Sequence, residues 1–276
     1  MLVTIYIPTR NRLPLLKRAI NSVREQSYNE IELIVVDDCS CDGTREFLVE
    51  CESRGELKGI YQEASAGACV ARNLAISASS GVFVTGLDDD DYFMSSSKIS
   101  NYVSQWQNSH LKLAGLFDCA KVLSNGHVVE QFTSTFVDHL DLRRSNYVGN
   151  QVFAPKHHFV GAGLFDPEMP AWQDWDLWLR MSRLYGGFAN IKLFGTHIDE
   201  RHALDRISSR SQEVIREAMN KLINKLGPLS LRERSYLISA LHSYPQVRPT
   251  ISEIATIIAG RRLQASLSSI AKLVEY

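Results

Sequence analysis

The chain has 276 residues, is 45% hydrophobic, and contains 30 lysines and arginines against 31 aspartates and glutamates. This composition is too apolar for a disordered chain, and the length suits one large α/β domain or a domain with a smaller appendage. The formal net charge of −1 argues against a general nucleic-acid-binding protein, which would be strongly basic. The charge is unevenly divided: residues 201–276 hold 12 basic and 6 acidic residues, a net of +6, and residues 1–200 carry −7.

The cysteines and the N-terminus favour a cytoplasmic protein. No run reaches the roughly 20 apolar residues of a transmembrane helix, and the N-terminus lacks the basic region of a signal peptide. The five cysteines are odd in number and thinly spread, which favours reduced thiols over a disulfide framework. Cys39 and Cys41 form a Cys-x-Cys pair, but no second close pair completes a zinc site.

The first third of the chain alternates between short apolar runs and segments with helical periodicity. Strands are expected over Val3–Ile7, Glu32–Val36, Gly59–Gln62 and Gly81–Leu87, and helices over residues 14–26, 42–54 and 67–79. This order predicts a mostly parallel sheet with crossover helices. The carboxyl ends of the strands, at residues 8–12, 37–41 and 88–91, would then converge on one edge of the sheet, where ligands bind in such folds.

The pattern changes after residue 110. Residues 111–170 suggest short strands and loops, and residues 174–184 are typical of a helix. After Ser208 the chain is helical and basic, with helices expected at residues 212–226, 231–244 and from 251 onward. We predict an α/β domain over residues 1–210 and a basic helical region over residues 211–276.

Three charged groups lie at or near the predicted sheet edge. Four adjacent carboxylates, Asp88–Asp91, repel one another, and Mg²⁺ or Mn²⁺ would relieve that repulsion; a solvated acidic loop is the alternative. Asp37 and Asp38 end a buried strand, where a carboxylate can bind a nucleobase or ribose or can cap a helix. The planar guanidinium of Arg72 suits a diphosphate; the alternative is an arginine that simply lies on the surface of its helix.

In this order and spacing, four segments strongly resemble the inverting glycosyltransferases of family 2: Ile5–Arg12, Glu32–Thr44, Gly67–Asn73 and Leu87–Asp91. The resemblance covers about residues 1–95 and resumes around residues 161–182. It implies an α/β GT-A fold, with a Rossmann-like, mostly parallel central sheet flanked by helices and, in this chain, a helical C-terminal extension. Cys39 and Cys41 replace the small residues usual in the family, at positions we interpret as tolerant loop sites.

The resemblance also implies a nucleotide-sugar site and a metal site. The residues implied to bind a UDP-sugar are Pro8, Thr9, Arg12, Asp38, Arg72, Asp88 and Asp89. Asp88 and Asp90 would form the Asp-x-Asp motif, with Asp90 as the direct ligand of Mn²⁺ or Mg²⁺, although four consecutive acids leave the register ambiguous by one position. His202 is a candidate further metal ligand, with a solvated loop histidine as the alternative.

The resemblance also implies that the catalytic base lies in the segment Trp172–Arg180. In this family an acidic pair opens a helix here, and because Gln173 replaces the usual glutamate, Asp174 is the candidate base. Inversion requires a carboxylate that accepts the proton of the attacking hydroxyl. An acid at a helix N-terminus also has a purely structural explanation, and Asp176 is interpreted as structural. Trp172 and Trp175 could stack on an acceptor sugar or pack in the core.

The resulting hypothesis is a metal-dependent inverting glycosyltransferase. It would move a sugar from a UDP-sugar to a saccharide hydroxyl, on a lipid-diphosphate carrier, in bacterial O-antigen or capsule synthesis. A sugar-1-phosphate nucleotidylyltransferase and a non-catalytic nucleotide-sugar or glycan-binding module are the alternatives. The basic C-terminal helices suggest peripheral contact with the inner face of the cytoplasmic membrane, or pairing into a homodimer, and no nucleic-acid partner is expected.

Overall fold

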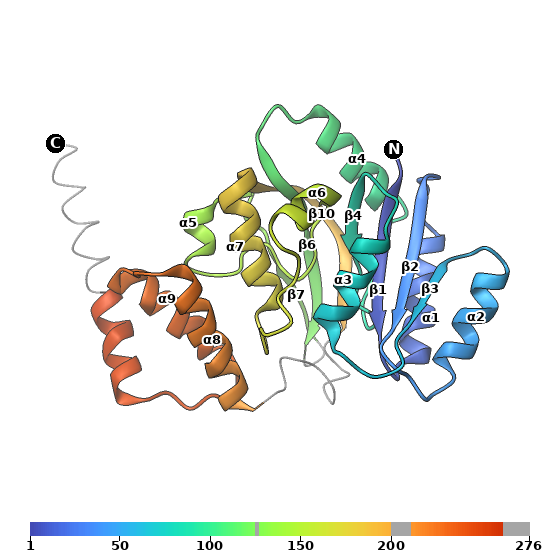
Figure 1. Cartoon of the computed structure of the whole chain (residues 1–276). Helices are drawn as coiled ribbons and strands as arrows, with labels where there is room; N and C mark the ends of the chain where they lie inside the picture. The colour runs from blue at the N-terminus through green and yellow to red at the C-terminus, as the bar shows by residue number, and fades with distance from the viewer. Residues whose placement is uncertain (125–126, 200–210, 262–276) are drawn as a thin grey trace. The chain divides into compact units, whose positions relative to one another are not determined.

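The computed structural model describes residues 1–124, 127–199 and 211–261 and divides them into two compact units. The first comprises residues 1–139, 147–167 and 173–199, apart from 125–126, and the second residues 140–146, 168–172 and 211–261 (Figure 1). The predicted boundary at residue 210 lies outside the described residues. The second unit also takes in two short segments from the middle of the chain, which sequence periodicity did not indicate.

The first unit is built on a five-stranded sheet. Its strand order is β3 (Lys58–Tyr61), β2 (Ile31–Asp37), β1 (Val3–Thr9), β4 (Phe83–Gly86) and β9 (Ala154–Pro155). The pairings among β1 to β4 are parallel, and only β9 runs antiparallel to its neighbour. The strands predicted in the first third of the chain are therefore confirmed, each within about two residues of its expected bounds.

The crossover helices cover both faces of this sheet. They are α1 (Leu13–Arg24), α2 (Thr44–Ser53) and α3 (Ala68–Ala78). The chain steps from β1 to β2 to β3 in one direction and returns past β1 to reach β4, so right-handed crossovers put α1 and α2 on one face and α3 on the other. Figure 1 shows α3 in front of the strands and α1 behind them.

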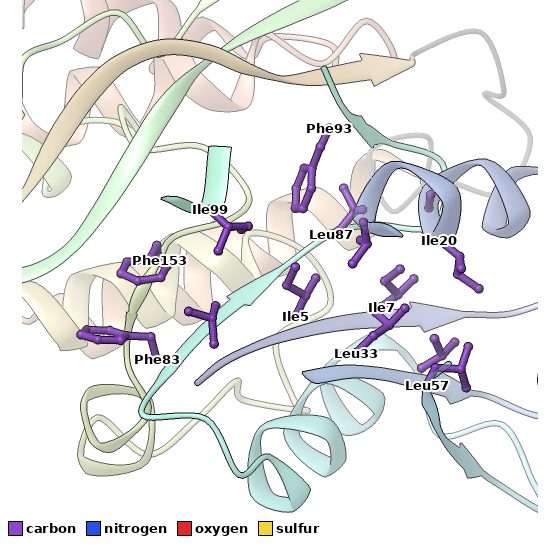
Figure 2. Packing of buried hydrophobic residues seen from close by; sticks show 14 of the residues in the cluster. Ile5, Ile7, Ile20, Leu33, Leu57, Phe83, Leu87, Phe93, Ile99 and Phe153 are labelled. Carbon is purple, nitrogen blue, oxygen red and sulfur yellow. The ribbon is translucent and has the colours of Figure 1, made fainter. Parts of the chain in front are cut away.

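The main core lies on the face covered by α1 and α2. Ile5 and Ile7 from β1 and Leu33 from β2 project to this face with the strand period of two and pack beside Ile20 from α1, as Figure 2 shows. The helix α4 (Lys98–Asn108) contributes Ile99 to the same cluster. Burial of these side chains fixes the register of the strands and, with it, the position of their carboxyl ends.

Strand β1 continues through Pro8, where the sequence suggested that it would end. Backbone groups of β1 alternate sides: the Tyr6 carbonyl accepts from Leu87 N at 2.9 Å, next to β4, and the Thr9 carbonyl accepts from Asp38 N at 2.9 Å, next to β2. Pro8 therefore turns its nitrogen toward β4, whose pairing with β1 has already ended at Tyr6 and Gly86. The missing N–H costs no ladder hydrogen bond.

A second sheet completes the first unit. Its order is β5 (Tyr92–Phe93), β10 (Gly187–Asp199), β6 (Leu113–Ser124) and β7 (His127–Gln131), with β8 (Phe136–Val137) also paired to β10. The same unit contains α6 (Lys156–Gly161) and α7 (Gln173–Tyr185). Helix α5 (His139–Leu142) begins in this unit with His139, and its other residues belong to the second unit. The helix predicted over residues 174–184 is confirmed, whereas β6 is longer than the short strands expected, and β10 lies in a segment for which no strand was predicted.

The second unit is helical. It contains α8 (Gln212–Leu226), α9 (Leu231–Leu241) and a further helix through residues 251–261. A capping box fixes the start of α9, because the Ser230 side chain accepts from Glu233 N and the Glu233 side chain accepts from Ser230 N. Arg143 also pairs with Glu233. Among the described residues, no helix is both long and apolar enough to cross a membrane.

A buried ion pair joins helix α4 to the second sheet. Lys98 Nζ donates to Asp118 Oδ2 at 2.8 Å and also to the Thr196 hydroxyl, and Tyr102 donates to Asp118 Oδ1 at 3.0 Å. Both charged side chains are under 10% exposed. Because the pair is fully hydrogen-bonded, it is tolerated inside the unit, but removing one partner would leave a buried charge uncompensated.

We expect Lys98→Met to lower the free energy of unfolding by about 3–5 kcal/mol, since Asp118 would remain buried and unpaired. Adding Asp118→Asn should recover most of the loss, because the amide oxygen still accepts from Tyr102. Urea denaturation measures the free energy of unfolding of the single and the double variant. Lys112→Met, at an exposed lysine, is the control, and its free energy of unfolding should change by under about 0.5 kcal/mol. Additive losses in the double variant would contradict a coupled pair.

Candidate active site

The carboxyl ends of β1, β2 and β4 meet at one edge of the sheet. Thr9 lies directly beside Asp37 in the parallel register of β1 and β2, and Leu87 is bonded to β1 just before the acidic run. The convergence predicted from the order of strands and helices is confirmed. Three chain segments that are separated by about 25 to 80 residues therefore present polar side chains to one another.

Residues of the first segment hold the acidic run. Thr9 Oγ1 donates to Asp89 Oδ2 at 2.8 Å, and Arg12 Nη1 lies 3.0 Å from Asp89 Oδ1 and 3.2 Å from Asp90 Oδ2. Asp89 and Asp90 are each 5% exposed. Burial raises the pKa of Asp89 to about 6, although the positive charge of Arg12 opposes this. Arg12 thus offsets part of the repulsion between adjacent carboxylates.

Asp88 accepts hydrogen bonds from three side chains. Arg72 Nη2 and Gln151 Nε2 each donate to Oδ1 at 3.0 Å, and Asn150 Nδ2 donates to Oδ2 at 2.9 Å and lies 3.3 Å from Asp91 Oδ2. Sequence reasoning missed Asn150 and Gln151, because they lie about 60 residues from the acids in a segment without regular periodicity. These partners fix the orientation of the Asp88 carboxylate.

Gly86 makes room for this arrangement. A Cβ at this position would lie 1.9 Å from Gln151 Oε1, so any other residue would force the amide away. Gln151 Oε1 also accepts from the buried Tyr6 hydroxyl at 3.1 Å. Gly86, two residues before the acidic run, is thus a signal in the sequence that another group lies close to the strand, because a glycine inside a strand often marks such a close approach.

Arg72 connects the acidic run to the start of α7. Its Nη1 donates to Gln173 Oε1 at 3.1 Å while Nη2 is bonded to Asp88, and its guanidinium lies 5.3 Å from the centre of the Phe165 ring. The neighbouring Asn73 bonds both backbone groups of Phe165, at 2.7 and 2.9 Å. The planar guanidinium therefore joins two segments that are about 85 residues apart in the chain.

Asp174 lies in the first turn of α7 and is partly exposed. Burial raises the pKa of its carboxyl, while the backbone N–H of Trp175 and the charge of Arg72 oppose the rise. The helix start and the desolvation thus act on the pKa of Asp174 in opposite directions. Asp176 has a structural environment, since Arg180 binds its Oδ2 through Nη2 at 2.7 Å and Nε at 3.1 Å.

The two tryptophans considered for acceptor stacking are buried. Trp175 is 3% exposed and lies on α7, and Trp172 is 7% exposed and belongs to the second unit, where its indole N–H donates to the Tyr244 hydroxyl at 2.9 Å. Trp178, on the same helix, is fully buried and donates to the Gly149 carbonyl. Packing accounts for both Trp172 and Trp175 better than stacking on a sugar.

The paired aspartates at the end of β2 have different environments. Asp38 accepts four hydrogen bonds of 2.6 to 3.0 Å from the segment Gln62–Gly67, two of them from backbone N–H groups. Asp37 is fully buried; Ser40 N donates to its Oδ1, and among the described residues its Oδ2 has no hydrogen-bond partner and lies 3.8 Å from Arg45 Nε. Asp38 thus shapes the loop, and Asp37 retains an unused acceptor.

A polar pocket of about 290 Å³ lies next to these aspartates. It is lined by Cys39, Ser40, Cys41, Gly43, Arg45, Glu46, Gln62 and Glu63. Cys39 has a φ of 63°, a left-handed conformation that explains why a small residue is usual at this position. The two cysteines are free thiols at the rim of the pocket, as expected from the sequence.

A stacked group of rings and a guanidinium lies behind the acidic run. Arg18 from α1 donates to the Asp90 carbonyl, and its guanidinium lies 4.8 Å from the centre of the Tyr92 ring. On β10, His197 stacks on Tyr92 with ring centres 4.7 Å apart. Since Tyr92 directly follows the acids, this stack restricts the backbone at Asp90. Sequence reasoning missed Arg18.

The metal-binding prediction rests on the acids alone. Among the residues that the structure describes, no group of three or more His, Cys, Asp or Glu side chains could hold a metal ion by itself. His202 lies outside the described residues. Asp88 and Asp90 supply the hard oxygen atoms that Mg²⁺ and Mn²⁺ prefer, and such ions usually take only one or two carboxylates and complete their shell with phosphate and water. The acids present fit a cation of this kind.

Comparison with known proteins shows which family this chain belongs to. A family model described as "Glycosyl transferase family 2" matches residues 4–121. The chain is 35% identical over 190 residues to the putative colanic acid biosynthesis glycosyl transferase WcaA of Escherichia coli, covering 67% of each chain. It is 31% identical to WfgD of Escherichia coli, a UDP-Glc:alpha-D-GlcNAc-diphosphoundecaprenol beta-1,3-glucosyltransferase, over 48% of this chain and 51% of that one.

Solved structures show the same fold. Staphylococcus aureus TarS, solved with UDP-GlcNAc, matches with a TM-score of 0.67 and 21% identity over 87% of this chain and 71% of that one. The mannosyltransferase PcManGT of Pyrobaculum calidifontis, solved with GDP-Man and Mn²⁺, matches with a TM-score of 0.62 and 19% identity over 99% and 80%. The predicted GT-A fold is confirmed, and the chain belongs to glycosyl transferase family 2.

Proposed function

We propose that this glycosyltransferase moves a sugar, with inversion, from a UDP-sugar to a hydroxyl of a saccharide acceptor. The observation that carries the proposal is the link made by Arg72, which bonds Asp88 of the acidic run and Gln173 beside Asp174. Donor-binding acids and a candidate base are thereby held in one network. The name of WfgD includes UDP-Glc, and TarS was solved in complex with UDP-GlcNAc, which supports the choice of donor.

The acceptor in this proposal is a saccharide on a lipid diphosphate, in bacterial surface polysaccharide synthesis such as that of O-antigen or capsule. WcaA is named for colanic acid biosynthesis and WfgD for a diphosphoundecaprenol-linked acceptor. The chain spans two thirds of WcaA and about half of WfgD, and both matches support the class of acceptor without specifying the sugar. Contact with the inner face of the cytoplasmic membrane, through the basic helices, belongs to the same proposal.

The nucleotide would bind at the edge formed by β1 and β2. Thr9 and Arg12 lie at one side of this edge, and Asp38, whose backbone N–H donates to the Thr9 carbonyl, lies beside them. Asp38 contributes by holding the segment Gln62–Gly67. Arg72 and Arg12 place positive charge near the acids, where a diphosphate would otherwise be repelled.

A divalent cation would be held by Asp90 and Asp88 together with the diphosphate. When bound, Mn²⁺ or Mg²⁺ would neutralise the negative charge that grows on the leaving UDP. Asp88 has its orientation set by Arg72, Asn150 and Gln151, and Arg18 holds the backbone at Asp90. The PcManGT structure with Mn²⁺ supports this choice of ion.

Asp174 would act as the general base. In an inverting transfer the acceptor hydroxyl attacks the anomeric carbon directly, and its proton must pass to a nearby carboxylate as the new bond forms. Partial exposure lets an acceptor reach Asp174, and its raised pKa makes the carboxylate a better proton acceptor than an ordinary aspartate. Membership of glycosyl transferase family 2 gives no support to the alternative of a sugar-1-phosphate nucleotidylyltransferase. The other alternative, a non-catalytic binding module, would give Asp174 no role.

For Asp174→Asn we expect transfer to fall by about 10²–10⁴-fold, because the amide cannot accept the proton, while UDP-sugar affinity stays within about threefold. UDP release and product mass with a lipid-diphosphate saccharide acceptor measure transfer, and calorimetry measures donor binding. In the unchanged protein, activity should rise with pH through a pKa above that of an ordinary aspartate, since only the ionised form is a base. Undiminished transfer by the variant would exclude Asp174 as base.

Removal of divalent cations should abolish transfer, and added Mn²⁺ or Mg²⁺ should restore it. We expect Asp90→Asn to raise the Mn²⁺ concentration for half-maximal activity at least about tenfold, because a neutral amide binds a hard cation more weakly. The exposed Glu130→Gln serves as a control with the same change in charge. Full activity in the presence of a strong chelator would show that the acids have another purpose.

Substitutions of the two aspartates at the end of β2, Asp37 and Asp38, should differ in their effects on stability and on nucleotide binding. Asp38→Ala leaves the donors of Gln62–Gly67 without their acceptor and should cost about 1–3 kcal/mol of unfolding free energy. Asp37→Asn preserves the shape of a side chain that is fully buried and does not line the neighbouring pocket, so the Kd for UDP should stay nearly unchanged. Urea denaturation and calorimetry measure the two quantities. A large rise in Kd for Asp38→Ala without lost stability would instead indicate direct contact with the nucleotide.

A further inference from the structure

One face of the helix through residues 251–261 is apolar and exposed. Ile251 is 89% exposed, Ile254 45% and Ile258 48%, and Ala255 between them is exposed as well. The offsets of three, four and seven residues put these four side chains in one row along the helix. We call Ile251, Ile254, Ala255 and Ile258 the apolar stripe. Figure 1 shows this helix as the last coloured one of the chain.

The other side of the helix is fixed to the rest of the second unit. Glu253 forms an ion pair with Arg216 and lies 3.2 Å from His242 Nε2. Gly260 is buried, and a Cβ there would lie 2.4 Å from the Ser235 hydroxyl. Thr250 caps the helix, since its Oγ1 accepts from Glu253 N at 3.3 Å and its own N–H donates to Glu253 Oε2 at 2.8 Å. These contacts orient the helix with the stripe turned outward.

Positive charge flanks the stripe. Arg248 lies three residues before Ile251, Arg261 lies three residues after Ile258, and both are exposed. The only acid from residue 248 to residue 261 is Glu253, and its side chain is 12% exposed and paired with Arg216. Within residues 248–261, the outward face therefore combines an apolar row with cations at both ends and has no exposed carboxylate.

This combination distinguishes between the two partners that could cover the stripe. In a symmetric dimer the same row would meet itself, bringing the arginines of two copies together without an acid to compensate them. An anionic lipid surface takes both features: isoleucines enter the boundary between headgroups and acyl chains, and arginines meet the phosphates. The charge of the surface thus favours lipid over a second copy.

We propose that the apolar stripe, with Arg248 and Arg261, docks this protein on an anionic lipid bilayer. The inference deepens the membrane contact in the proposed function, on which it rests. It names the surface that makes the contact and the class of lipid that it recognises. The docking itself needs neither nucleotide sugar nor acceptor, and can be measured in their absence.

The test uses the full chain with vesicles of phosphatidylcholine alone or mixed with phosphatidylglycerol. The unchanged protein should sediment with the mixed vesicles and not with pure phosphatidylcholine, and added salt should weaken binding. Ile254→Glu should reduce partitioning at least about tenfold, since it puts a charge in the middle of the stripe. The matched control is Val49→Glu on α2, where an equally exposed apolar residue, 51%, should be replaceable without effect.

Three outcomes would overturn the proposal. Equal partitioning of the unchanged protein and Ile254→Glu would show that the stripe does not contact lipid. A dimer that dissociates on this substitution, without vesicle binding, would assign the stripe to a second copy. A lowered Tm of the variant, without vesicle binding, would assign it to packing within the chain. Transfer to a water-soluble acceptor is assayed in parallel, so that loss of docking is distinguished from loss of catalysis.

Discussion

The compensation of four adjacent carboxylates at the end of β4 is the constraint on which the site depends. Carboxylates buried next to one another repel strongly: burial, together with the charge of Asp90, raises the pKa of Asp89 to about 6 even though Arg12 opposes the rise. Arg12 and Arg72 supply the opposite charge, and the amides of Asn150 and Gln151 supply neutral donors. These partners come from three separate parts of the chain, so compensating the acids also assembles the site.

The sequence predicted the parts of this site that follow from local pattern. Parallel strands put their carboxyl ends at one edge, so the meeting of Thr9 with Asp89 could be expected from strand order alone. The partners of Asp88 could not, because Asn150 and Gln151 lie in irregular chain. Likewise, the roles of Asp37 and Asp38 depend on which carboxylate turns toward the loop at residues 62–67, which no periodicity shows.

The fold shows the same division between local and long-range information. Helices α1, α3, α7 and α8 have strong 3.6-residue periodicity and were predicted within about two residues of their ends. Strand β6 was underestimated and β10 was not predicted, because their pairing with each other contains bulges that disturb alternation. Pro8 ended the predicted first strand too early. Only the position of β4 beside β1 shows that a proline is tolerated there.

The uneven charge of the chain follows from the same physical requirement. The buried carboxylates at the end of β4 need compensating cations, and Arg12 and Arg72 are bonded to them. Arg248 and Arg261, by contrast, are exposed, and the one acid from residue 248 to residue 261, Glu253, is paired with Arg216. The proposal of lipid docking gives these two arginines a partner outside the chain. The net charge of −1 is the sum of −7 over residues 1–200 and +6 over residues 201–276, and the two parts serve different purposes in the proposed function.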